Sequence, residues 1–318
     1  MQVVHGYSHV PITARAAVIA IGNFDGVHRG HRALIGAAVA KGKELGRAPG
    51  VMIFEPHPRE FFQPSEPLFR LTPLNRKLAL LEKLGVKVAF VENFDAHFAG
   101  LSAQEFIERV LVAGLGIAHV IIGYDFYFGH KRAGNPQMMV EAGKDLGFGV
   151  TVVAPVAEAG EVFSSSAVRV YLAQGDVKGA THVLGEHWRV QGKVIGGAKR
   201  GTGLGFPTAN VPMPKGTALA HGIYAVRAHV DGKHYDAAAY LGTRPTFDNG
   251  MPVLEVFIFD FQGDLYGHDL DVEFVDFVRG DRKFASGDEL IHQMDEDVKK
   301  IRAVLSSPSR GEGGASAI

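Results

Sequence analysis

The sequence predicts an α/β domain with a Rossmann-like parallel sheet, followed by a small β-barrel domain with a C-terminal helix. Up to residue 185, short apolar runs alternate with longer segments whose apolar residues recur at helical spacing, which is typical of a parallel sheet covered by helices. After Gly185 the pattern changes to short alternating strands separated by glycine, proline and aspartate turns. We therefore expect two domains, 1–185 and 186–305, and a disordered tail, 306–318.

The composition excludes several classes of protein. Of 318 residues, 46% are hydrophobic and 21% are charged, which suits about two folded domains. With a formal net charge of −1, the chain lacks the excess of positive charge that is typical of proteins that bind nucleic acid or an anionic membrane. The absence of cysteine excludes disulfides and cysteine-ligated zinc. With no signal-peptide pattern and no apolar run of membrane-spanning length, we expect a cytoplasmic protein, whose oligomeric state the sequence leaves open.

The elements of the first domain follow in order from their apolar spacing and their caps. Short apolar runs bounded by turn residues predict strands at 16–21, 50–54, 86–91, 119–123 and 150–153. Helical periodicity or a capping box predicts helices at 32–45, 74–84, 102–112 and 176–184. The alternation of the two kinds of segment favours parallel strands joined by helices.

The junction between the first strand and its helix, residues 21–31, has the composition of a phosphate site. Free backbone N–H groups and the positive end of a helix dipole face whatever binds above such a junction. His28 and His31 flank Gly30, whose missing side chain would let a phosphate approach the backbone, and two imidazole donors would stabilise attack on an α-phosphate. The residues of this stretch that we expect to bind the nucleotide are Gly22, Asn23, Phe24, Asp25, Gly26 and Gly30.

The alternative is that both histidines are surface or helix-start residues, which is the commoner outcome for an isolated H-x-G-H. The whole string G-x-F-D-G-x-H-x-G-H, however, resembles the first motif of the bifunctional riboflavin kinase/FMN adenylyltransferase family, also called FAD synthetases. The resemblance implies a nucleotidyltransferase domain in which His28 and His31 are catalytic.

A second loop, residues 123–135, mixes aromatic rings, a carboxylate and two cations directly after a strand. Such a loop can hold an aromatic ring and a phosphate together, although its phenylalanines can equally belong to the core. It resembles the family's G-x-D-F-x-F-G segment, which implies that Asp125 and Phe126 lie at the nucleotide and flavin side of the site.

A third motif places three hydroxyls, Ser164, Ser165 and Ser166, at a helix start, with Arg169 one turn further on. Hydroxyls there can orient triphosphate oxygens while the guanidinium neutralises the leaving pyrophosphate. The alternative is a helix cap beside a solvated arginine. The string resembles the family's I-S-S-T-x-x-R, with serine in place of threonine at 166.

The second domain is expected to be a barrel closed by one helix. Strands are predicted at 188–194, 222–230, 233–240, 253–259 and 270–277, with a hairpin turn at Asp231-Gly232. Ser286 and Glu289 begin the last helix as a capping box. The helix face that should pack on the barrel carries Leu290, Met294, Val298, Ile301 and Leu305.

The glycine-rich stretch before the second strand of the barrel has neither P-loop nor dinucleotide-binding spacing. Gly201 and Gly205 still suit a flap over a triphosphate, helped by two preceding cations. Thr208 and Asn210 offer neutral oxygens on one side of an extended segment, where they can complete the shell of a phosphate-bound Mg²⁺. Their P-T-A-N string matches the family's in full.

Glu255 falls in a predicted strand, where a lone carboxylate is usually solvated. Residues 240–247 resemble the family's N-x-G-x-R-P-T-F, and the resemblance makes Glu255 the general base and places Arg279 at the flavin or nucleotide site. The sequence departs from the family pattern at Thr202, Tyr240 and Phe257.

The resemblance implies two reactions that use ATP and Mg²⁺. The barrel would phosphorylate riboflavin to FMN, and the first domain would adenylylate FMN to FAD with release of pyrophosphate. The departures motivate one rival, a monofunctional FMN adenylyltransferase whose barrel only binds flavin. Another rival is a nucleotidyltransferase for a different substrate, since H-x-G-H is shared across that superfamily. Composition and spacing alone indicate only an α/β nucleotide-binding domain followed by a small β domain.

Overall fold

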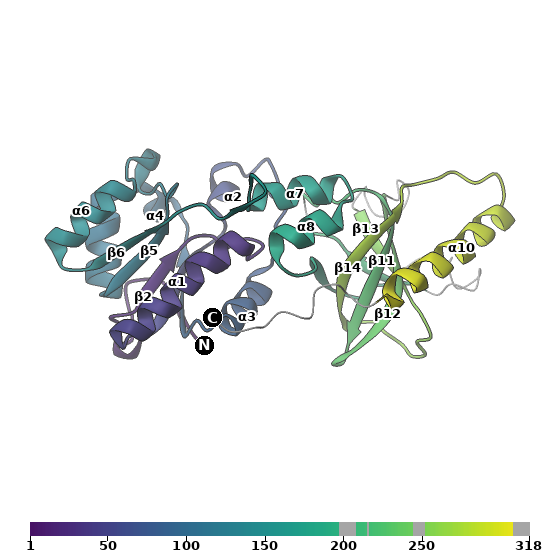
Figure 1. Ribbon diagram of the computed structural model, residues 1–318, viewed down its shortest axis with the longest axis horizontal. Coiled ribbons are helices and arrows are strands. Elements are labelled where there is room, and N and C mark those ends of the chain that lie inside the picture. Colours follow the sequence, from purple (N-terminus) through teal and green to yellow (C-terminus); the bar gives the residue numbers. More distant parts are fainter. Residues whose placement is uncertain (197–207, 215, 244–251, 308–318) are drawn as a thin grey trace. The chain divides into compact units, whose positions relative to one another are not determined.

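Six parallel strands form the sheet of the first part of the chain in the computed structural model (Figure 1). The structure describes residues 1–196, 208–214, 216–243 and 252–307. The chain divides into two compact units, Met1–Ala167 and Val168–Ile318, and each is described by itself.

The strand order in the first unit is β1-β4-β3-β2-β5-β6. The strands are β1 (Gln2–His5), β2 (Val18–Ile21), β3 (Pro49–Glu55), β4 (Val88–Asn93), β5 (His119–Gly123) and β6 (Gly149–Val153). After β2 the chain builds outward through β3 and β4 and then returns to place β5 on the other side of β2. The order therefore reverses between β2 and β5, and in open α/β sheets ligands bind at the carboxyl ends of the strands at such a switch point.

Helices cover both faces of this sheet. The helical segments are α1 (Arg29–Leu45), α2 (Pro58–Phe62), α3 (Leu74–Lys83), α4 (Ala96–Gly100), α5 (Ala103–Glu105), the π-helical continuation η2 (Phe106–Leu115) and α6 (Pro136–Leu146). Val18 and Ala20 of β2 face a core shared with α1 and α3, whereas Ile19 and Ile21 face a core shared with η2 and α6. Alternate residues of a buried strand thus supply two separate cores, as the uniformly apolar sequence of β2 requires.

The second unit is a nearly closed antiparallel barrel with the strand order β10-β13-β12-β11-β14-β9. Its elements are α7 (Ser165–Ala173, which begins in the first unit), α8 (Val177–Leu184), β9 (Arg189–Lys193), β10 (Ala209–Pro212), β11 (Gly222–Val230), β12 (Lys233–Thr243), β13 (Pro252–Ile258), β14 (Asp269–Arg279) and α10 (Gly287–Ser306). A bridge between Ile195 and Asn210 joins the two edges of the sheet. Closure leaves little unpaired edge.

The last helix packs on the outside of the barrel. Ile301 and Leu305 are buried against Ala225 and Phe259, while Val298 lies in the same cluster. The Ser286 hydroxyl accepts a hydrogen bond from the Glu289 N–H and caps α10. The predicted fold class, including this helix, is confirmed.

Sequence reasoning overlooked several elements of the first unit, among them β1, α6 and the short helices α2 and α4. The edge strand β1 has four residues of which only Val4 is buried, so it shows almost no apolar run. The sequence does contain start signals for α6 that we did not use. The Asn135 side chain caps the helix by accepting a hydrogen bond from the Met138 N–H, and Pro136 occupies the first helical position. We also expected the first helix from residue 32, but α1 begins at Arg29, so His31 lies in its first turn.

The expected tail covers 306–318, of which 308–318 lie outside the described residues. The domain boundary near Gly185 stays a prediction. The compact units divide earlier, between Ala167 and Val168, because α7 and α8 pack with the barrel. The Ala220 N–H donates to the Leu172 carbonyl, and the Lys178 ammonium pairs with Asp276 at 2.6 Å.

We predict that a fragment of residues 164–318 is more stable than one of residues 187–318. The longer fragment keeps α8, whose buried Val183 and Leu184 lie on the helix that packs on β14. Losing these side chains should lower the free energy of unfolding by about 2 kcal/mol or more. Urea unfolding can be followed by the fluorescence of Trp188, the single tryptophan, which contacts Phe274 in the barrel core. Equal stability of the two fragments would instead support a boundary at Gly185.

Candidate functional site

The turn after β2 holds its backbone in an unusual conformation. Phe24 and Val27 have positive φ angles of 48° and 46°, which side chains other than glycine rarely adopt. Gly26 between them has a φ of 84°, which glycine adopts without steric cost. Such strain is concentrated at functional sites, because the surrounding structure must hold it in place.

His28 ends this turn and caps α1. Its Nδ1 accepts a hydrogen bond from the His31 N–H at 3.3 Å, which satisfies one of the free donors at the helix start. An accepting Nδ1 carries no proton, so the neutral ring carries its proton on Nε2. Burial lowers the pKa of His28 to about 4, and the ring is therefore neutral near pH 7.

His31 lies one helical turn away, and its ring stacks on that of His28 with 3.5 Å between centroids. Burial, and then the charges of His28 and Lys77, hold the pKa of His31 well below its usual value. Its Nδ1 is buried and forms no hydrogen bond with any residue that the structure describes. An unsatisfied buried nitrogen beside a helix start is an observation that favours a polar ligand there.

The serine motif packs directly against this turn. The Ser165 hydroxyl donates to the Asp25 carbonyl at 2.8 Å, and the guanidinium of Arg29 lies 4.4 Å from the centre of the Phe163 ring. A Cβ at position 30 would come within 3.0 Å of the Phe163 carbonyl oxygen, so Gly30 permits this contact. The first and third motifs, well separated in sequence, thus meet in one unit.

The three serines differ in their surroundings. The Ser164 hydroxyl accepts from the Ala167 N–H at 3.1 Å and caps α7, as one alternative from the sequence had it, while Ser166 is exposed. Arg169 lies on α7 in the second unit, and its contribution at the histidines stays a prediction.

Several predicted nucleotide ligands have structural partners. The buried Asp25 carboxylate accepts hydrogen bonds from the Leu71 and Thr72 N–H groups, so it also anchors the segment before α3. The Gly22 N–H donates to the Met52 carbonyl. The Asn23 side-chain oxygen is buried without a hydrogen bond among the described residues and so resembles His31 Nδ1.

The loop after β5 flanks the same switch point. Phe126 stacks on Phe128 with 5.4 Å between centroids, and Phe128 belongs to the core. Asp125 and Tyr124 are exposed. Phe128 is therefore a core residue, which was the alternative interpretation of this loop, while Asp125 remains available to a ligand.

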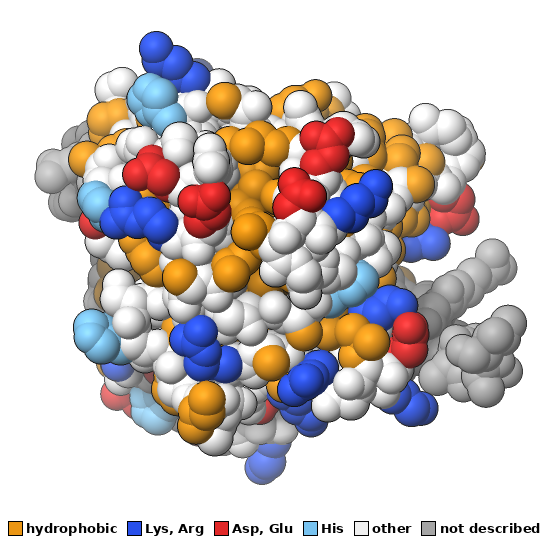
Figure 2. All heavy atoms as spheres, turned by 90° about the vertical axis from the view of Figure 1, so that its left-hand side faces the viewer, with side chains coloured by type: hydrophobic (Ala, Val, Ile, Leu, Met, Phe, Trp, Pro, Cys, Tyr) orange, Lys and Arg blue, Asp and Glu red, His pale blue; other side chains and the backbone are white. Residues whose placement is uncertain are grey.

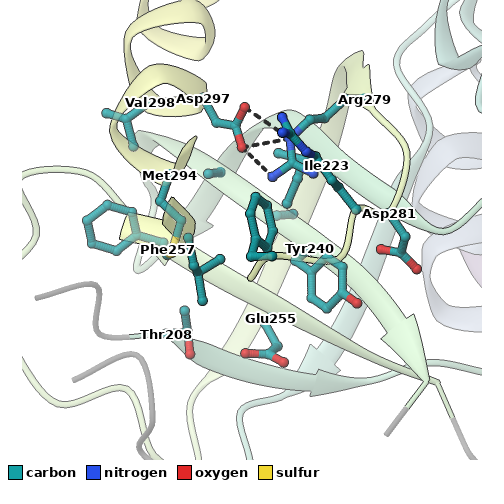
Figure 3. Close-up of a pocket in the computed structure, with 15 residues that line it drawn as sticks. Thr208, Ile223, Tyr240, Glu255, Phe257, Arg279, Asp281, Met294, Asp297 and Val298 are labelled. Atoms are coloured by element: carbon teal, nitrogen blue, oxygen red, sulfur yellow. Dashed lines mark hydrogen bonds and ion pairs between the residues drawn. The ribbon is translucent and has the colours of Figure 1, made fainter. Parts of the chain in front are cut away.

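A cavity of about 350 Å³ lies in the second unit, between the outer face of the barrel and α10 (Figure 3). Thr208, Tyr240, Glu255 and Phe257 line its strand side. The rest of the cavity is lined by Arg279 at the end of β14, by Asp281, Arg282 and Phe284 of the loop that follows, and by Leu290, Met294, Asp297 and Val298 of α10. Its volume and mixed polar and apolar walls suit a small-molecule ligand.

Register brings the predicted catalytic and metal residues of the barrel together. Glu255 of β13 lies directly opposite Asn210 of β10 on one side and Tyr240 of β12 on the other. Residues directly opposite each other share a face of the sheet, as do residues two apart, which adds Thr208 and Phe257. Asn210 is 5% exposed and Thr208 lines the cavity.

Arg279 lines the cavity, and its contact with a flavin or nucleotide stays a prediction. Its guanidinium forms a bidentate ion pair with the buried Asp297, with Nη2 at 2.7 Å and Nε at 2.9 Å from Oδ2. The Gln293 side chain donates to the other oxygen of Asp297 at 3.0 Å. Arg279 therefore ties β14 to α10 at the cavity wall, as the dashed lines in Figure 3 mark.

Sequence reasoning missed part of each site. We expected Leu290 and Met294 to pack on the barrel, but both line the cavity, whereas Ile301 and Leu305 of the same helix are buried against the barrel. Lys77 of α3 is 3% exposed near His31 and was not singled out. The sequence does indicate its burial, because Lys77 lies three and four residues before Leu80 and Leu81 and therefore on the same apolar helix face. Gly201 and Gly205 lie outside the described residues.

Two family models match the chain, one within each of its two compact units. The FAD synthetase model matches residues 11–167 and the riboflavin kinase model matches residues 184–305. The fold and the two sites therefore define a transferase of the flavin-nucleotide class, with two modules in one chain.

Relatives cover almost the whole chain. One from Haemophilus influenzae is 38% identical over 96% of this chain and 100% of its own length, and one from Pseudomonas fluorescens is 40% identical over 97% and 99%. One from Escherichia coli K12 is 39% identical over 92% and 94%. All three are called bifunctional riboflavin kinase/FMN adenylyltransferase. The chain belongs to the bifunctional riboflavin kinase/FMN adenylyltransferase family, and the resemblance seen in its motifs is confirmed.

A solved structure shares the fold over nearly the whole chain. The crystal structure titled a macrolide-efflux protein from Streptococcus pneumoniae has a TM-score of 0.82 and 28% identity, and the match covers 95% of this chain and 99% of that one. The activity in that title is that protein's own. Across the described part of this chain, no helix is both long enough and apolar enough to span a membrane.

We predict that His28 titrates near pH 4 in the folded protein and is the Nε2–H tautomer at neutral pH. Because its ordinary pKa is 6.5, the unfolded chain takes up this proton between pH 6.5 and about 4. The free energy of unfolding should therefore fall as the pH falls through that window. Nitrogen chemical shifts of labelled histidine measure both tautomer and pKa, with the urea-unfolded chain as the control. A folded-state midpoint near 6.5 would contradict this prediction.

Proposed function

We propose that the histidine turn is the FMN adenylyltransferase site and that the barrel cavity is the riboflavin kinase site. The chain is an enzyme of FAD biosynthesis that uses ATP and Mg²⁺, with riboflavin, FMN and FAD as substrates and products. The observation that carries this assignment is the pairing of two buried neutral imidazoles at the switch point of one unit with a carboxylate facing a cavity in the other.

In adenylyl transfer, an FMN phosphate oxygen bonds to the α-phosphorus of ATP, and the bond from that phosphorus to the bridging oxygen breaks. The electron pair leaves with pyrophosphate. Neutral His28 donates from Nε2, and His31 donates from a ring nitrogen, to the oxygens on which charge grows. Ser164 and Ser166 orient triphosphate oxygens, Ser165 holds the turn through its hydrogen bond to the Asp25 carbonyl, and Arg169 neutralises the leaving pyrophosphate. The chemistry needs no covalent intermediate with the enzyme.

In phosphoryl transfer, Glu255 accepts the proton of the riboflavin primary alcohol as that oxygen bonds to the γ-phosphorus and the bond to the β-bridging oxygen breaks. Thr208 and Asn210 would hold Mg²⁺, which offsets phosphate charge when bound. Their neutral oxygens, on the same face as Glu255, fit an ion whose other ligands are phosphates. Arg279 acts through Asp297 to position α10 over the flavin.

The monofunctional alternative is not favoured, because both family models match and the relatives carry both activities in their name. Tyr240 and Phe257, which depart from the family pattern, both line the cavity, so they change its shape and leave Glu255 and Thr208 in place. Purified chain mixed with riboflavin, ATP and Mg²⁺ should form both FMN and FAD. Formation of FAD only from supplied FMN would restore the alternative.

We also propose a cytoplasmic location, which the absence of cysteine in the sequence fits, and no nucleic-acid partner, which the low net charge supports. The net charge is −1, and on the face drawn in Figure 2 acidic, basic and apolar side chains are interspersed rather than gathered by sign. Small-molecule substrates follow from the activity.

We predict that the double variant His28→Ala/His31→Ala loses FAD formation from FMN and keeps FMN formation from riboflavin. Losing one preorganised donor typically costs about a hundredfold or more in rate. Chromatographic separation of FMN and FAD measures both activities in one preparation. The matched control is His97→Ala, an exposed histidine of the same unit. Equal loss of both activities would show that the histidines support folding instead.

We predict that Glu255→Gln still binds riboflavin but phosphorylates it about a hundredfold to ten-thousandfold more slowly. Glutamine keeps the size of the side chain and removes the base, so FAD formation from supplied FMN should be unchanged. Quenching of flavin fluorescence measures binding, and FMN formation measures the rate. The control is Asp269→Asn, an exposed carboxylate at the start of β14. A fully active Glu255→Gln would show that the base lies elsewhere.

Phe257→His, which restores the residue common in the family, should change the rate of riboflavin phosphorylation only slightly.

A further inference from the structure

Lys77 is a buried lysine that the reactions described above do not use. It lies on α3, at 3% exposure, on the same face as Leu80 and Leu81. That face packs into the core that also contains Phe24 and Val27 of the histidine turn. Lysine is almost never fully buried unless it is paired, so its position requires a reason.

Asp25 joins the histidine turn to the segment that leads into α3. Its carboxylate accepts from the Leu71 and Thr72 N–H groups at 3.0–3.2 Å, and α3 begins two residues later. This anchor brings Lys77 within electrostatic reach of His31, whose pKa the lysine charge helps to lower. The lysine and the unsatisfied His31 Nδ1 therefore belong to one neighbourhood.

The carboxylates that face Lys77 already have partners. Asp25 is held by its backbone N–H donors, and Glu55 and Glu60 both pair with the Arg70 guanidinium, Glu55 at 2.6 Å. Arg70 also faces Lys77 and opposes its charge. Among the residues that the structure describes, the Lys77 ammonium has no ion pair. Burial lowers the pKa of Lys77, and the three carboxylates oppose that shift.

The adenylyl transfer needs positive charge at this place. Two anions, the phosphate of FMN and the triphosphate of ATP, must approach each other, yet His28 and His31 are neutral and can donate hydrogen bonds without supplying charge. Lys77 is 3% exposed and lies within electrostatic reach of His31, and an ammonium on such a side chain attracts a phosphate strongly. Its desolvation costs stability in the absence of substrate and is offset when the anion binds.

We infer that the Lys77 ammonium binds a substrate phosphate beside His31 and supplies the positive charge for adenylyl transfer that the two neutral histidines lack. This role rests on the proposed function of the histidine turn. The phosphate belongs either to the α-position of ATP or to FMN, and the chemistry of recognition is the same for both.

The test compares Lys77→Met, which keeps most of the length of the side chain and removes the charge, with Lys77→Arg, which keeps the charge. Lys83→Met, at the exposed end of the same helix, is the matched control. Lys77→Met should lower kcat/KM for FAD formation about a hundredfold, and riboflavin phosphorylation in the same preparation should be unchanged. If kcat/KM falls when it is measured at varied ATP concentration, the contact is assigned to the α-phosphate of ATP. If it falls only when it is measured at varied FMN concentration, the contact is assigned to the FMN phosphate. Lys77→Arg should retain several times more activity than Lys77→Met, and Lys83→Met should behave as the wild type.

Two further measurements separate this role from a structural one. Removing an unpaired buried charge should leave the thermal midpoint of Lys77→Met unchanged or higher, and the pKa of His31 should rise because a neighbouring charge is gone. FAD formation within twofold of the wild type, a parallel loss of FMN formation, or a folded Lys77→Arg as impaired as Lys77→Met would each overturn the inference. If the wild-type chain forms FAD and His31→Ala does not, the proposed function of the histidine turn is supported independently of Lys77. A negative result for Lys77→Met would then contradict only the role of the lysine.

Discussion

The hydrogen bonds from the Leu71 and Thr72 N–H groups to the buried Asp25 carboxylate hold the first unit together at its switch point. They connect the turn after β2 to the entry of α3, two segments far apart in sequence. The turn needs such support, because Phe24 and Val27 keep positive φ angles that they would not hold alone. Ser165, from a third segment, adds a bond to the Asp25 carbonyl. The histidines are thus fixed by three parts of the chain before any substrate arrives, which is the preorganisation that catalysis by hydrogen-bond donors requires.

Burial gives the two histidines their chemical character. A surface histidine changes charge near pH 6.5, whereas His28 stays neutral down to about pH 4, and its Nδ1 is committed to the His31 N–H. One nitrogen with a defined proton is then left to face a ligand. In the proposed mechanism the histidines donate hydrogen bonds and nearby cations such as Lys77 supply the positive charge.

The barrel builds its site by different means. Antiparallel register alone sets Glu255 between Asn210 and Tyr240, so a carboxylate and the proposed metal residues share a face without any strained turn. The ion pair between Arg279 and the buried Asp297 then holds α10 at the mouth of the cavity. A bidentate pair fixes orientation as well as distance, which suits a helix that must cover a ligand without filling its space.

The sequence by itself determined the fold class, most of the strands and the family, because apolar periodicity and short motifs are local properties, while the roles of its site residues stay predictions. Val18–Ile21, His119–Gly123 and the Asp231-Gly232 turn could be located from a few neighbouring residues. Only the tertiary structure decided that Asp25 anchors α3, that Arg279 pairs with Asp297, and that Lys77 is buried near His31. Each of these depends on segments that are distant in sequence, and local patterns carry no information on which distant partner a charged side chain will meet. The same limit applies to the pKa of His28, since burial is a property of the folded chain rather than of the motif that contains it.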